Sequence, residues 1–94
     1  MLLALLVACA PSWEGFIEQK PEAICVQQMA CAAGAYDSED ECVDEMADAL
    51  ADEEEPENYD AQAAADCLEL SRHPDCSDEG VQAWSDACHE AEGA

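Results

Sequence analysis

Apolar residues recur three or four positions apart along much of the chain, the spacing of a helix that packs on one side. After Ser38 they fall at Cys42, Met46 and Leu50, and they stop before the acidic run that ends at Pro56. Ser38 and Glu41 fit a capping box, in which the serine caps the helix and the glutamate reaches back. This pattern predicts a helix that begins just after Ser38.

Helix-starting and helix-stopping residues bound the other apolar stretches. Pro21 suits the first position of a helix, and Gly34 suits a left-handed cap at its end, so we expect a helix over residues 22–33. Asn58 or Asp60 is placed to cap a third helix, which Pro74 stops.

A fourth helix is predicted to begin at Ser77 or Asp78, with Val81, Trp84 and Cys88 on one face. No stretch has the alternation or the β-branched residues of a strand. The expected fold is therefore all-α, with three or four short helices.

Charge excludes several functional classes. The 94 residues hold 24 Asp and Glu against 2 Lys and Arg, a net charge of −22. Such a chain repels phosphate backbones, so we expect no nucleic acid as a partner. The densest stretch, residues 37–60, is interpreted as a solvated, repulsive face, as a loose cation site or as a docking surface for a basic protein.

The N-terminus indicates export. Leu2 to Val7 is an uninterrupted apolar run, too short to span a membrane but suited to a secretory signal. Leu6, Val7, Ala8 and Cys9 resemble the lipobox of bacterial lipoproteins.

This resemblance implies a signal peptide at residues 1–8, a lipid on Cys9 as membrane anchor, a tether over residues 9–20 and a domain over residues 21–94. Ala10 after the cysteine implies the outer membrane, facing the periplasm or the surface. Trp13 and Phe16 would touch the membrane interface or fold back onto the domain. A plainly cleaved, secreted protein and a buried apolar N-terminus are the alternatives.

Six cysteines remain once Cys9 is set aside: Cys25, Cys31, Cys42, Cys67, Cys76 and Cys88. In an exported chain they predict three disulfides. A zinc site would need closer cysteine spacing or more than the two histidines present, and reduced thiols are the other alternative. Because alanine is the main apolar residue, burial alone falls short of the ordering entropy, so we expect the disulfides to decide folding.

The pairing is less constrained. On one helix, Cys25 and Cys31 point about 120° apart and must reach different partners. Cys31–Cys42, Cys67–Cys76 and Cys25–Cys88 is the pairing we favour. The main competitor joins Cys25 to Cys67 and Cys76 to Cys88.

No nucleophile, base and orienting residue can be named together, and both His73 and His89 lie near helix ends. We therefore expect no enzyme activity, metal or cofactor. A calcium-loop register from Asp75 departs from the required residues at several positions. The chain looks like the small cysteine-rich lipoproteins of bacteria, most of which have no assigned activity. The expected function is a lipid-anchored, non-enzymatic envelope protein that presents an acidic helical surface to a basic protein; the alternative is a weak divalent-cation-binding or buffering module.

Overall fold

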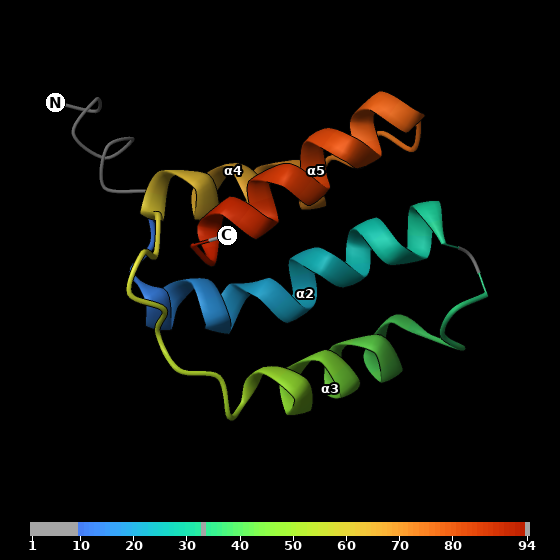
Figure 1. Cartoon of the computed structure of the whole chain (residues 1–94). Helices are drawn as coiled ribbons and strands as arrows, with labels where there is room; N and C mark the ends of the chain where they lie inside the picture. The colour runs from blue at the N-terminus through green and yellow to red at the C-terminus, as the bar shows by residue number, and fades with distance from the viewer. Residues whose placement is uncertain (1–9, 33, 94) are drawn as a thin grey trace, which may run out of the picture.

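The structure, a computed structural model, describes residues 10–32 and 34–93. Four helices make up its regular structure: α2 (Trp13–Cys31), α3 (Glu39–Leu50), α4 (Ala61–Arg72) and α5 (Asp78–Ala91). Helix α2 packs against α3 on one side and α4 on the other, and α4 packs against α5 (Figure 1). Within the described ranges there are helices and no strands, which confirms the all-α prediction.

The largest departure from expectation is the start of α2. It begins at Trp13, so the predicted domain boundary at Pro21 is wrong. The predicted tether over residues 9–20 is wrong from Trp13 onward, because residues 13–20 belong to the helix. Ser12 caps the helix, its hydroxyl accepting a hydrogen bond from the Gly15 N–H (3.1 Å). Pro21 therefore lies inside the helix rather than at its first position.

Burial of aromatic side chains explains this start. Trp13 and Phe16 are 8% and 0% exposed, so they fold back onto the domain. A proline in a helix interior costs about 3 kcal/mol. An aromatic side chain buries about 150–250 Å² and gains about 4–6 kcal/mol at about 25 cal/mol per Å². The free energy gained by burying two such side chains exceeds the cost of the proline. The residue that packs against them, Tyr59, lies far along the chain.

Tyr59 closes the aromatic cluster from the loop before α4. Its ring lies 5.4 Å from that of Trp13 and 6.1 Å from that of Phe16, between centroids. Its hydroxyl donates a hydrogen bond to the Pro11 carbonyl oxygen (2.7 Å). The tyrosine therefore attaches the chain before α2 to the folded core.

Replacing Tyr59 with phenylalanine is expected to lower the free energy of unfolding by about 1 kcal/mol, the value of one such hydrogen bond. Burial, and then the charges of Glu55 and Asp60, raise the pKa of Tyr59 above its ordinary value. The neutral form is thus favoured in the folded state. This contribution is fully present below the ordinary tyrosine pKa of about 10 and is lost as the pH rises through the folded value.

Unfolding titrations from neutral to alkaline pH test this prediction. The natural protein should lose stability more steeply above about pH 10 than Tyr59→Phe does. Parallel curves for the two proteins would show that the hydroxyl has no special role.

The predicted N-caps of the other helices are confirmed. Ser38 and Ser77 accept hydrogen bonds from the backbone N–H groups three residues on, and Asp60 accepts two, from Gln62 and Ala63. The Glu41 carboxylate reaches back to the N–H of Asp37, one residue before the cap (3.3 Å).

Three disulfides crosslink the domain, as predicted, but every predicted pair is wrong. The bonds are Cys25–Cys42, Cys31–Cys76 and Cys67–Cys88. Neither the favoured pairing, Cys31–Cys42, Cys67–Cys76 and Cys25–Cys88, nor its competitor with Cys25–Cys67 and Cys76–Cys88 occurs. What does hold is that Cys25 and Cys31 reach different partners.

Helix register explains the actual bonds. Cys42 lies one turn inside α3, so its level on α2 is that of Cys25 rather than of the helix end at Cys31. Cys67 likewise lies well inside α4, away from the turn that holds Cys76, and faces Cys88 on the antiparallel α5. Two predicted pairs, Cys31–Cys42 and Cys67–Cys76, rested on closeness to a turn, whereas Cys25–Cys42 and Cys67–Cys88 join levels along packed helices. Cys31–Cys76 joins the end of α2 to the turn between α4 and α5.

The α4–α5 turn depends on a close approach at Gly80. A Cβ atom added there would lie 2.3 Å from the Asp75 backbone oxygen. Gly80→Ala is therefore expected to destabilise the oxidised protein by about 1–3 kcal/mol through overpacking. Gly15→Ala in α2 is the matched control: Gly15 is likewise the third residue of its helix, and its nearest neighbour would lie 3.4 Å away, so no overpacking is expected.

Urea unfolding of both variants with the disulfides intact measures the difference. Equal changes of either sign in the two variants would contradict the close contact at Gly80.

Candidate interaction surface

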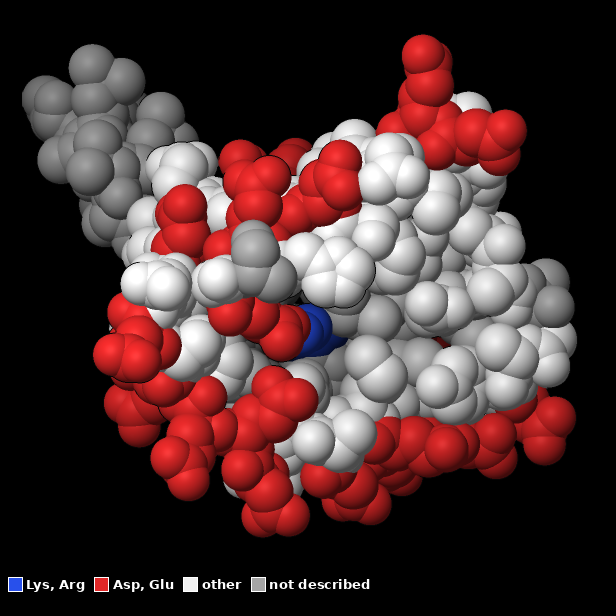
Figure 2. Space-filling model, viewed as in Figure 1, with Lys and Arg blue, Asp and Glu red and all other residues white. Residues whose placement is uncertain are grey.

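Exposed carboxylates cover the outer side of α3. Figure 2 shows Asp and Glu side chains gathered along this helix, with uncharged residues between them and the acids of the opposite edge. The exposed acids of α3 are Glu39, Asp40, Glu41, Asp44, Glu45 and Asp48. All six acids of this helix are therefore exposed to solvent.

The side chains of Lys20 and Arg72 each bind another residue of this chain. Lys20 is 8% exposed and forms an ion pair with Glu92, and its Nζ lies 5.3 Å from the centre of the Phe16 ring. Arg72 donates a hydrogen bond to the side-chain oxygen of Gln19 (2.9 Å). The acids of α3 therefore have no lysine or arginine of this chain as a partner among the described ion pairs.

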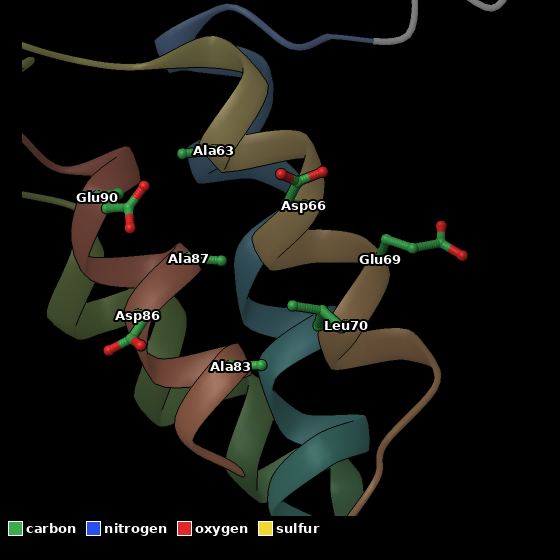
Figure 3. Close-up of a pocket in the computed structure, with 8 residues that line it drawn as sticks. All are labelled: Ala63, Asp66, Glu69, Leu70, Ala83, Asp86, Ala87 and Glu90. Atoms are coloured by element: carbon green, nitrogen blue, oxygen red, sulfur yellow. The ribbon is translucent and has the colours of Figure 1, made fainter. Parts of the chain in front are cut away.

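A groove of about 360 Å³ runs between α4 and α5 (Figure 3). Its floor is apolar and made mostly of small side chains: Ala63, Leu70, Ala83 and Ala87. In the close-up, Ala83 and Ala87 of α5 point toward α4, and Leu70 points back toward Ala83. We call this feature the α4–α5 groove.

Carboxylates stand on both banks of the α4–α5 groove. Asp66 and Glu69 belong to α4, and Asp86 and Glu90 belong to α5. Each aspartate accepts a hydrogen bond from the glutamine one turn before it, Asp66 from Gln62 (3.4 Å) and Asp86 from Gln82 (2.8 Å). The residues that line the groove are thus either apolar or negatively charged.

Two further hollows are present. One of about 720 Å³ lies between the start of α2 and the end of α3, with Trp13, Ile17 and Leu50 on its floor and glutamates on its rim. Another, of about 300 Å³, lies beside the Lys20–Glu92 pair.

The two histidines considered for chemistry lie at the ends of α4 and α5. His73 is an exposed helix cap 3.4 Å from the Glu69 carboxylate. His89 borders the hollow beside Lys20, and its Nδ1 lies 3.4 Å from the Ser85 hydroxyl.

Asp75 serves the turn before α5. Its carboxylate accepts a hydrogen bond from the Ser77 N–H (3.0 Å), and this bond lowers the pKa of Asp75. Its contribution to stability is present above the ordinary aspartate range and is lost as the pH falls through the lowered value. In residues 10–32 and 34–93, no group of three or more His, Cys, Asp and Glu side chains converges in a way that could hold a metal ion.

The predicted signal peptide at residues 1–8 and the predicted lipid site at Cys9 lie outside the described residues. None of the helices that the structure describes has the length and apolar character needed to cross a bilayer.

Sequence reasoning missed the α4–α5 groove and the buried Lys20. The sequence signal for the groove is a run of mostly small apolar residues and acids at intervals of three or four positions. It occurs in residues 63–70 and again in residues 83–90.

Together, fold and surface define a disulfide-linked helical domain with an acidic exterior. No family model, curated protein or solved structure matches the chain.

Proposed function

We propose that this is a non-enzymatic, lipid-anchored protein of the cell envelope that presents an acidic helical surface to a basic protein. The observation that carries the proposal is the row of exposed acids on α3. Neither Lys20 nor Arg72 is paired with these acids, because Lys20 pairs with Glu92 and Arg72 bonds to Gln19. Unneutralised carboxylates at this density attract a cationic partner over distances of about 10 Å at ordinary salt.

The anchor in this proposal is Cys9, in the segment that resembles a lipobox. Two or three acyl chains give a stable membrane anchor where one is marginal. Pro11 is buried and hydrogen-bonded by Tyr59, so only Ala10 separates Cys9 from the attached chain. The domain would then be held at the outer membrane, facing the periplasm or the surface, without a long tether; a secreted form is the alternative.

The surface is tested by binding to an immobilised Lys- and Arg-rich peptide at increasing salt. We expect binding to fall by about tenfold or more between about 0.05 and 0.5 M salt, because salt screens exposed charges. A variant with Asp44→Asn, Glu45→Gln and Asp48→Asn should bind more weakly than the natural protein at low salt. Binding that is unchanged by salt and by these substitutions would contradict the proposal.

The anchor is tested by the intact mass of the protein purified from membranes. We expect the mass of a chain beginning at Cys9 plus the acyl groups. A chain of that length without added lipid, or one that retains residues 1–8, would contradict lipidation.

A further inference from the structure

We propose that the α4–α5 groove is the docking site for a cationic amphipathic helix of the partner protein. This inference rests on the proposed function and adds to it a second contact with the partner, on α4 and α5 rather than on α3. The partner helix would place a row of apolar side chains on the groove floor and Lys or Arg side chains beside both banks.

The floor permits a helix to approach closely. Ala63, Ala83 and Ala87 are small, so a side chain of an incoming helix fits between α4 and α5 as a ridge fits a groove. Only Leu70 projects a larger side chain, toward Ala83 (Figure 3). Contact with this floor would cover apolar surface that is now open to solvent.

The groove is already formed without a partner. The Cys67–Cys88 disulfide joins α4 to α5 with their Cα atoms 4.7 Å apart. The Asp60 N–H, at the start of α4, donates a hydrogen bond to the Ala91 carbonyl at the end of α5 (3.2 Å). Because these links fix the register of the two helices, little ordering is needed when a ligand binds.

The bank charges select a cation-bearing occupant. Asp66 and Glu69 are three residues apart on α4, and Asp86 and Glu90 are four apart on α5, so each pair lies along one side of its helix. Lysines or arginines spaced three or four residues apart on a partner helix would meet them on both sides of its apolar row.

Other occupants match these features less well. A second copy of this chain would bring its own acidic surface toward the banks, and like charges repel. A flexible polyamine would satisfy the carboxylates but would leave most of the apolar floor without a matching face. The combination of floor and banks therefore favours an amphipathic helix.

The test compares two synthetic peptides with the full oxidised chain by isothermal titration calorimetry. Both peptides contain the same leucines and lysines; one has them in an amphipathic helical order and the other in a scrambled order. We expect the amphipathic peptide to bind about tenfold or more tightly than the scrambled one and to gain helical circular dichroism.

The floor is tested with Ala83→Phe, which fills the groove without changing charge. Its matched control is Ala49→Phe, at an exposed alanine on α3. Ala83→Phe should abolish the preference for the amphipathic peptide, and Ala49→Phe should preserve it. Circular dichroism of the free variants confirms that both fold.

The banks are tested by neutralising four acids at a time. The bank variant carries Asp66→Asn, Glu69→Gln, Asp86→Asn and Glu90→Gln, and the control carries Glu22→Gln, Asp44→Asn, Glu45→Gln and Asp48→Asn. The control variant should bind both peptides more weakly by the same factor, so that the ratio of their affinities is unchanged. The bank variant should bring this ratio close to one.

Failure of this inference and failure of the proposed function give different results. If both peptides bind equally in a salt-sensitive manner and Ala83→Phe changes nothing, the groove inference is wrong and the acidic surface still binds cations. If neither peptide binds at low salt, the proposed function itself is wrong. Spermidine gives a third possible result. If spermidine displaces the amphipathic peptide, and Ala83→Phe weakens the binding of spermidine as much as that of the peptide, the groove is a polyamine site and the helix proposal is wrong.

Discussion

Reduction of the three disulfides is expected to unfold this protein at neutral pH. The bonds close chain separations of 17, 45 and 21 residues. Each such crosslink stabilises a folded domain by about 3–4 kcal/mol. The sum, about 9–12 kcal/mol, is as large as the whole stability of an ordinary small domain, about 5–15 kcal/mol.

The core of this domain has little else to replace the crosslinks. Alanine and cysteine make up most of its buried apolar residues, and the net charge of −22 opposes compaction. Far-ultraviolet circular dichroism before and after reduction and alkylation measures the effect. We expect most of the helical signal to disappear, and a reduced chain that keeps its helices and its compact size would contradict the prediction.

Phe16→Ala is expected to destabilise the protein strongly. The side chain is fully buried and contacts the Trp13 and Tyr59 rings. Truncating a buried phenylalanine costs about 3–5 kcal/mol, through lost burial and the cavity that remains. Tryptophan fluorescence during urea unfolding of the oxidised protein gives the measurement.

Ile17→Ala is the matched control, because Ile17 is the next residue on α2 but is only partly buried. It should destabilise the protein clearly less than Phe16→Ala does. If residues 13–20 were a tether outside the fold, both variants would change the stability by less than about 0.5 kcal/mol. That result would restore the domain boundary at Pro21.

Local signals in the sequence predicted local structure well. Ser38, Asp60 and Ser77 each cap the helix that was predicted to follow, because a cap depends only on the few residues beside it. Gly34 has a φ of 95°, as expected for a left-handed residue after a helix.

Features that depend on distant partners were not predictable in the same way. Pro21 resembles a helix start until Trp13 and Phe16 are known to pack against Tyr59, which lies on another segment. The disulfide pairs likewise depend on the register between helices. Cys42 bonds to Cys25 because of the register in which α3 packs along α2. The spacing of the cysteines in the sequence does not reveal that register.

The candidate site has the same limit. The acids of α3 were visible in the sequence, but the α4–α5 groove exists only because two helices lie in one antiparallel register. That register is set by the Asp60–Ala91 hydrogen bond and the Cys67–Cys88 disulfide.

The disulfide pairing can be tested with one cleavage reagent. Cyanogen bromide cuts after Met29, between Cys25 and Cys31, and after Met46. Under non-reducing acidic conditions, Cys25–Cys42 and Cys31–Cys76 should keep the fragment of residues 30–46 bound to both of its neighbours. Mass spectrometry should therefore find one linked species that separates only on reduction. Release of residues 30–46 as a free peptide closed by Cys31–Cys42 would contradict this account.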